Sequence, residues 1–185
     1  EMINQGLAAE RIAEKWHISK EELDKFSLES HQKAIIAQKE GHFTKEIMPL
    51  EVPVPDGTRT LVKQDEGPRS DTSLEKLASL KPSFTENGVI TAGNSSQISD
   101  GAAAILLMSR EKAEELRLKP RFRIIGRAVV GSDPTLMLTG VIPATEKVLK
   151  QTSLSIEEID VFEVNEAFAP VPLAWLKETG ADPAK

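Results

Sequence analysis

The chain has 185 residues, of which 39% are hydrophobic and 28% charged, a composition typical of a globular protein rather than a disordered one. Its net charge of −6 argues against a general nucleic-acid binder, which needs a basic surface to displace counterions. The absence of cysteine excludes disulfides, thiolate metal sites and a cysteine nucleophile within these residues.

The sequence also lacks the patterns of a membrane span or an export signal. No apolar run reaches about 18 residues, and the first ten residues, EMINQGLAAE, contain neither a basic stretch nor an apolar core. We therefore expect a cytoplasmic protein that does not enter a membrane. The histidines at positions 17, 31 and 42 are not spaced as metal ligands, so we expect no metal site and interpret them as solvated surface residues.

The first 41 residues have the pattern of a helical hairpin. GLAAERIAEKW has the spacing of a short amphipathic helix. Ser19 and Glu22 form a capping box that begins a second helix, and Gly41 ends it. Two aromatic side chains are expected to anchor the pair in the core: Trp16 and Phe26.

Residues 42–70 contain four prolines and the turn sequences DGT and EGP, which predict extended segments and turns rather than long helices. TRTLVKQD is a candidate short strand. A second capping box, Thr72 with Glu75, predicts a brief helix through LEKLASL that Pro82 ends. A region of this kind is more typical of an insertion laid over another domain than of an independent fold.

After residue 88 the pattern becomes that of an α/β protein. AAAILLM, residues 102–108, is a continuous apolar run that predicts a strand buried on both faces. FRIIGRAVVG and IDVFEV are two further predicted strands. Helices are predicted between and after them, in REKAEELRL behind a Ser109 cap, in PATEKVLKQT, and in LAWLKE up to Gly180. This alternation implies crossover connections and a largely parallel sheet.

Two loops next to the predicted strands contain candidate site residues. In TAGNSSQISDG, a plain turn explains the glycines and Asp100, whereas a functional interpretation has Ala92 and Gly93 admitting a ligand to the backbone and Ser96 bonding it. The loop lacks the Gly-Lys-Ser/Thr ending of a P-loop. In the other loop, which lies between predicted elements, Arg69 is either a solvated charge or a guanidinium that binds phosphate or stacks on a base.

The motif VNEAFAP follows the last predicted strand and allows two interpretations. Asn165 can cap a helix and Glu166 can favour its dipole, or the neutral amide can hold a water and stabilise an oxyanion. Pro170 would collide with the preceding turn if the helix began directly after Asn165. We therefore predict a non-helical corner at residues 165–167 and a regular helix that begins near Phe168.

Taken in order, the motifs GNSSQISDGAAAILLMS, VGSDP, TGVIPATEKVL and IDVFEVNEAFA resemble the middle of a thiolase, a member of the acetyl-CoA acyltransferase family. GLAAERIAEKW and SHQKAIIAQKEGHFTKEIMP resemble the loop domain inserted in that family. The resemblance implies an α/β fold of layered α-β-α-β-α architecture that this chain covers in part. It divides the chain into residues 1–87 of the insertion domain, 88–118 at the end of the N-terminal half, and 119–185 at the start of the C-terminal half.

The resemblance also implies a reaction and its site. A thiolase interconverts 3-ketoacyl-CoA and coenzyme A with acetyl-CoA and a shortened acyl-CoA, with coenzyme A as a substrate and no tightly bound cofactor. Asn165 matches the residue that holds the water of the oxyanion hole. Further positions match contacts to the nucleotide, pantetheine and acyl parts of coenzyme A: Arg69, Phe84, Ala92, Gly93, Ser96, Met137, Ala167 and Phe168. The expected partners are acyl-CoA and further copies of the same chain in a dimer or tetramer.

In this family the nucleophilic cysteine lies upstream of the matched region, and a histidine and a second cysteine lie downstream. We therefore expect the chain to be an internal piece that is inactive alone, within a parent thiolase that forms an acyl-enzyme. The alternative, from a different class of function, is a non-catalytic module that binds coenzyme A or a protein.

Overall fold

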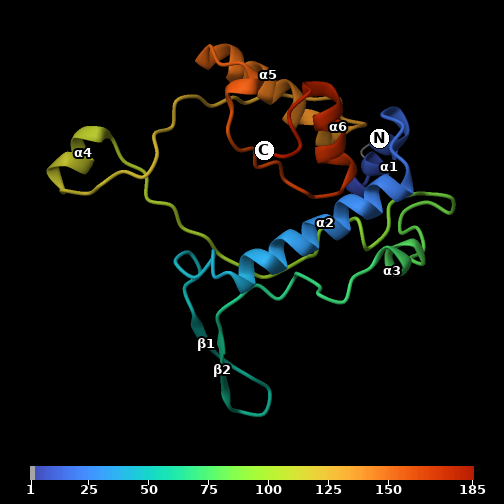
Figure 1. Ribbon diagram of the computed structural model, residues 1–185, viewed down its shortest axis with the longest axis horizontal. Coiled ribbons are helices and arrows are strands. Elements are labelled where there is room, and N and C mark those ends of the chain that lie inside the picture. The colour runs from blue at the N-terminus through green and yellow to red at the C-terminus, as the bar shows by residue number, and fades with distance from the viewer. Residues whose placement is uncertain (1–2) are drawn as a thin grey trace.

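The computed structural model describes residues 3–185 and begins with the two predicted helices (Figure 1). They do not pack along each other as the predicted hairpin would, because the first packs against the C-terminal helix and the second against the short helix at residues 74–78. Helix α1 spans Gln5–Lys15 and helix α2 spans Lys20–Lys39. The capping box of α2 is confirmed, because Ser19 Oγ accepts from the Glu22 amide at 3.2 Å and Glu22 Oε2 accepts from the Ser19 amide at 2.7 Å. Gly41 follows the end of α2 with a positive φ of 74°, as its predicted role as a terminator requires.

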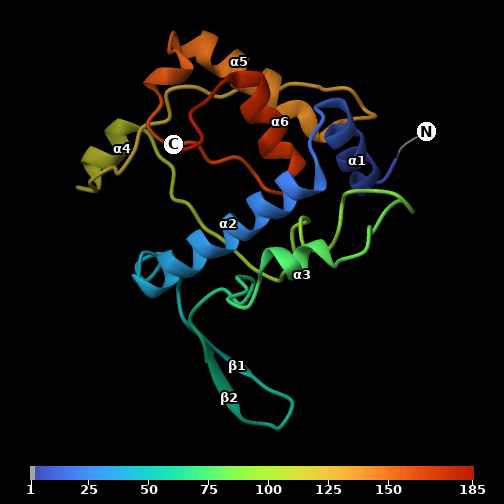
Figure 2. The same ribbon diagram turned by 45° about the vertical axis from the view of Figure 1, so that its right-hand side comes forward.

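Residues 42–82 contain a β-hairpin and one short helix. Strands β1 (Leu50–Pro53) and β2 (Arg59–Val62) pair antiparallel, and the hairpin projects away from the helices in both views (Figures 1 and 2). The strand predicted in TRTLVKQD is thus confirmed, with β1 as its partner. Helix α3 (Leu74–Ala78) lies beside α2.

The predicted cap of α3 is wrong by one residue. Ser73, rather than Thr72, accepts from the Lys76 amide at 3.3 Å. Thr72 belongs to the preceding turn, where its amide donates to the Arg69 carbonyl at 3.4 Å. The helix itself lies where LEKLASL predicted it.

Five helical elements follow residue 88 in the described part of the chain. Helix α4 (Arg110–Glu115) begins at the predicted Ser109 cap, whose hydroxyl accepts from the Lys112 amide at 3.2 Å. The 3₁₀ turn η1 (Met137–Gly140) leads into α5 (Val141–Thr152), and a second 3₁₀ turn, η2, covers Ile156–Glu158. Helix α6 (Pro170–Thr179) ends at Gly180 in the left-handed conformation, as predicted.

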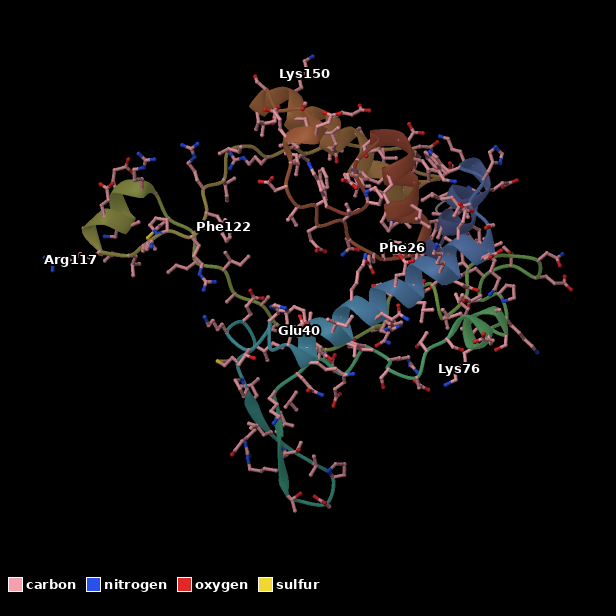
Figure 3. The ribbon with its side chains drawn as sticks, in the orientation of Figure 1. Phe26, Glu40, Lys76, Arg117, Phe122 and Lys150 are labelled. Atoms are coloured by element: carbon pink, nitrogen blue, oxygen red, sulfur yellow. The ribbon has the colours of Figure 1, made fainter. Side chains whose placement is uncertain are left out.

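The three strands predicted after residue 88 are not paired in this chain. Residues 102–108, 122–131 and 159–164 have no ladder partner within the described part of the chain, whose one sheet is the β1–β2 hairpin. The prediction that residues 102–108 are buried on both faces is wrong here, since Ile105 is 84% exposed. Phe122 is 92% exposed on the long connection between α4 and α5 (Figure 3). A strand buried on both faces needs a neighbour at each edge and a cover on each face, and these residues supply neither.

The core forms where α1 packs against α6 and η1. Its buried side chains come from α1, the α1–α2 connection, the start of α2, the loop before residue 96, the N-cap of η1, and the start of α6 with the two residues before it: Ala9, Ile12, Ala13, Ile18, Leu23, Ile90, Leu136, Phe168, Ala169, Val171 and Ala174. Trp16 and Phe26 are partly buried and pack against this cluster, so both predicted anchors contact the core. Across residues 3–185, no helix is both long and apolar enough for a bilayer crossing.

Candidate functional site

A cleft of about 1230 Å³ lies between α2, α3, the loop of residues 92–99 and the corner at residues 165–166. Figure 2 shows α2 and α3 side by side along this region. Five of the residues singled out from the sequence line the cleft: Arg69, Ala92, Gly93, Ser96 and Asn165. They are separated by up to 96 positions in the chain, so the fold brings together the two loops and the VNEAFAP motif.

The corner before α6 has the predicted geometry. Residues 165–167 are not helical, and α6 begins at Pro170, two positions later than the predicted Phe168. At this first helical position the missing N–H of proline costs little. Ala169 occupies the N-cap position without a side-chain hydrogen bond. Among the described residues, the Asn165 side chain makes no hydrogen bond to the amides of Ala167 or Phe168, so it does not cap α6.

Asn94 holds the floor of the cleft together. Its Oδ1 accepts from the Thr91 amide at 2.9 Å, and its Nδ2 donates to the Val89 carbonyl at 3.0 Å and to Asp24 Oδ1 at 3.4 Å. The Asn94 carbonyl accepts from the Ala169 amide at 2.9 Å. This side chain is 3% exposed and connects α2, the loop and the start of α6. The sequence prediction missed it; its only local signal was the tendency of asparagine to bond nearby backbone.

The loop beside Asn94 is fixed to the corner through its backbone. The Ser96 amide donates to the Ala167 carbonyl at 2.9 Å, and Ser95 forms an isolated antiparallel bridge with Phe168. At Gly93, a Cβ would lie 2.5 Å from Leu77 Cδ2 on α3. Close packing against α3 therefore favours glycine at this position, beside the predicted role of admitting a ligand to the backbone.

One wall of the cleft is polar. Its hydrogen bonds join α2 to the loop of Arg69 and to the corner at residues 165–166. His31 Nδ1 accepts from the Arg69 amide at 3.1 Å, and the hydroxyl of Ser30 donates to Glu166 Oε2 at 2.7 Å. The interpretation of His31 as a solvated surface residue is wrong, because the ring is half-buried and hydrogen-bonded. Burial lowers the pKa of His31, the Arg69 charge lowers it further, and the Glu166 carboxylate opposes both.

A cation and an acid on the far side of the cleft neutralise each other in part. Lys76 Nζ lies 2.8 Å from the Asp71 carboxylate and also donates to the Asp71 carbonyl at 2.6 Å. The bond from Lys76, together with its charge, lowers the pKa of Asp71. The cleft therefore has two cationic side chains, Arg69 and Lys76, and two acidic ones, Asp71 and Glu166, with Lys76 paired to Asp71.

The other four predicted site residues lie outside the lining of this cleft. Phe168 is 8% exposed and meets the Phe84 ring edge-to-face, with ring centroids 5.9 Å apart. Ala167 and Phe84 are partly buried against the core, and Met137 begins η1. None of the four lines the cleft, and their predicted contacts with coenzyme A stay predictions.

Comparison with known sequences identifies two matched regions. The thiolase N-terminal domain matches residues 1–111, and the thiolase C-terminal domain matches residues 118–185. The steroid 3-ketoacyl-CoA thiolase FadA6 of Mycobacterium tuberculosis is 49% identical over 183 residues, which cover 99% of this chain and 43% of that protein. The 3-ketoacyl-CoA thiolase of Aliivibrio fischeri is 49% identical over 95% of this chain and 46% of its own length.

Solved structures agree with the sequence matches. The crystal structure of the Bacillus anthracis acetyl-CoA acetyltransferase superimposes with a TM-score of 0.95 at 42% identity, over 99% of this chain and 46% of that one. Human mitochondrial 3-ketoacyl-CoA thiolase gives a TM-score of 0.93 at 40% identity, over 97% of this chain and 45% of that one. The layered α/β fold expected from the sequence is therefore confirmed for the part that the chain covers, which is about half the length of these proteins.

Proposed function

The chain belongs to the thiolase family, and from this premise we propose that the whole protein is an acetyl-CoA C-acyltransferase of acyl-CoA metabolism. It cleaves 3-ketoacyl-CoA with coenzyme A, or condenses acetyl-CoA in the reverse direction. The observation that carries the proposal is the uncapped Asn165 at the corner before α6, which lines the same cleft as Ser96 and Arg69. Relatives named as thiolases and acetyl-CoA acyltransferases support it.

In this proposal Asn165 acts on the oxyanion. A cysteine thiolate from outside these 185 residues forms the acyl-enzyme, and a histidine from outside them activates it. The Asn165 amide is neutral and uncommitted to the helix, so it can hold a water that donates to the developing negative charge. Asn165 lies just before Ala167 and Ala169, whose backbone bonds to Ser96 and Asn94 fix the chain, and this favours preorganisation because little rearrangement is needed when charge develops.

Coenzyme A is proposed as the ligand of the cleft. Arg69 supplies a planar cation for phosphate or the base, and Ala92, Gly93 and Ser96 line the floor where small side chains allow close approach. The remaining predicted contacts stay part of the proposal on the strength of the family resemblance alone: Phe84, Met137, Ala167 and Phe168. We further propose that the whole protein is a cytoplasmic dimer or tetramer that acts in β-oxidation.

The test is an assay of the whole protein with acetoacetyl-CoA and longer 3-ketoacyl-CoAs in the presence of coenzyme A. Thiolysis is expected, with loss of the 3-ketoacyl-CoA absorbance and formation of acetyl-CoA. A whole protein that contains the upstream cysteine and downstream histidine and yet cleaves none of these substrates would contradict the proposal.

A second candidate function rests on the absence of cysteine from the chain. Thiol catalysis is impossible within these residues, so a non-catalytic module that binds coenzyme A is the alternative. An intact-mass measurement of the natural protein separates the two. A mass that corresponds to this chain alone would favour the binding module, and a mass near that of the matched relatives would favour the enzyme.

A further inference from the structure

The corner that carries Asn165 is held to α2 by one side-chain hydrogen bond. The hydroxyl of Ser30 donates to Glu166 Oε2 at 2.7 Å, although the two residues are 136 positions apart in the sequence. Ser30 lies in the part of the chain matched by the thiolase N-terminal domain, and Glu166 lies in the part matched by the C-terminal domain. The bond therefore joins the two matched domains immediately beside the amide of Asn165.

Backbone hydrogen bonds fix the chain on either side of Asn165 but not at Asn165 itself. Before it, the Phe162 amide donates to the Lys185 carbonyl at 2.9 Å. The Ala167 carbonyl accepts from Ser96, and the Ala169 amide donates to Asn94, each at 2.9 Å. In the part of the chain that the structure describes, residues 163–166 make no backbone hydrogen bond. The side-chain contact of Glu166 with Ser30 is thus the restraint closest to Asn165.

Glu166 is not explained by the start of the helix. An acid favours the helix dipole when it lies in the first turn. Helix α6 begins at Pro170 and has no acidic residue in its first turn, so Glu166 lies outside the range of that effect. Its carboxylate instead faces α2, where it accepts from Ser30.

We propose that Glu166 is a positioning residue: Ser30 holds its carboxylate, and this contact directs the neighbouring Asn165 amide into the cleft. The inference rests on the proposed function, because the role of Asn165 in catalysis belongs to that proposal. It adds a coupling across the two matched domains, in which the position of α2 determines the orientation of the oxyanion amide. Displacement of a catalytic group by about 1 Å can cost up to about a hundredfold in rate.

The test uses the whole protein and steady-state thiolysis. Glu166→Ala is expected to lower kcat by about tenfold to a hundredfold with little change in KM. Glu166→Gln should retain activity within about threefold, because its amide oxygen still accepts from Ser30. Ser30→Ala should also lower kcat, but by less than Glu166→Ala does. Glu163→Ala, at an exposed acid on the same extended segment, is the matched control and should leave kcat unchanged.

The deciding measurement is the same change in an Asn165→Ala background. If Glu166 acts through Asn165, Glu166→Ala should cause no further loss there, because effects of residues that act as a unit are not additive. An equal loss in both backgrounds, or a loss that follows a lower melting temperature and is not rescued by glutamine, would overturn the inference. An inactive wild-type protein would instead overturn the proposed function and the inference with it, so the two failures are distinguishable.

Discussion

Asn165 stands between an extended segment and the first turn of α6, with its side chain free of any capping role in the described structure. Asn165→Ala in the whole protein is therefore expected to slow turnover by about tenfold to a thousandfold, as loss of one oxyanion-hole element does. Stability should change little, because no capping bond is lost. The measurement is kcat together with the melting temperature, with the exposed Asn87→Ala as control. A large fall in melting temperature without a fall in kcat would assign the amide a structural role instead.

Protonation of His31 is expected to make the stability of the protein depend on pH. Its neutral ring accepts the Arg69 amide at Nδ1, which the imidazolium cannot do because both of its nitrogens carry protons. Its pKa lies below the ordinary value of 6.5, so as the pH falls below 6.5 the unfolded chain binds the proton first. The contribution of His31 to the free energy of unfolding is therefore fully present above pH 6.5. It is lost as the pH falls through the lowered pKa.

The matching variant is His31→Asn, whose Oδ1 can accept the same amide without titrating. Urea unfolding of the whole protein between about pH 5 and pH 7.5 should show a shallower loss of stability in the variant than in the wild type. If the free energy of unfolding depends on pH identically in the two proteins, His31 does not contribute to that dependence.

The residues that could be predicted are those whose role follows from local chemistry. Asn165 could be placed at a non-helical corner because Pro170, five positions later, restricts where the helix can begin. Asn94 and Asp24 could not be predicted, because their hydrogen bond joins residues 70 positions apart and nothing in either segment indicates the other. His31 was misassigned for the same reason, since its acceptor role depends on a loop 38 positions away.

At the scale of elements, helix α2 depends on its capping box. Ser19→Ala removes the acceptor for the Glu22 amide and is expected to lower the free energy of unfolding of the whole protein by about 1 kcal/mol, whereas Ser19→Thr should restore most of it. The backbone and hydroxyl bonds from Ser19 also lower the pKa of Glu22, so this contribution is present above pH 4.5 and is lost as the pH falls below it. Urea unfolding at neutral pH measures the effect, and equal stability of the alanine and wild-type proteins would contradict it.

Helices were predicted more successfully than strands for a physical reason. The caps at Ser19 and Ser109 and the terminator Gly180 act within a few residues, so their sequence signals are complete. A strand is defined by its partner, and the apolar runs at 102–108 and 122–131 contain no information on where that partner lies. The hairpin β1–β2 shows the contrast, because its partner follows after a short turn around Gly57.

At the scale of the whole molecule, exposed apolar segments without partners lie on both sides of α4 in the chain, at residues 102–108 and 122–131. Ile105 is 84% exposed, Phe122 92% and Val129 85%. In a sheet such side chains would be covered by helices on both faces, so this chain alone exposes apolar surface that favours association. The cluster around α1 and α6 contains no residue of these segments.

We therefore expect the isolated 185-residue chain to self-associate or to remain partly molten. It should bind the dye ANS strongly and elute early in size exclusion, while far-ultraviolet circular dichroism still reports helix. Leu107→Lys, in the exposed run before α4 and itself 68% exposed, should reduce association by adding a charge to an unpaired segment. Arg123→Lys, at an exposed position and without a change in charge, should leave the self-association unchanged. A monomeric chain with a sharp, cooperative unfolding transition and weak dye binding would contradict the expectation, because it would mean that these segments are covered within the chain.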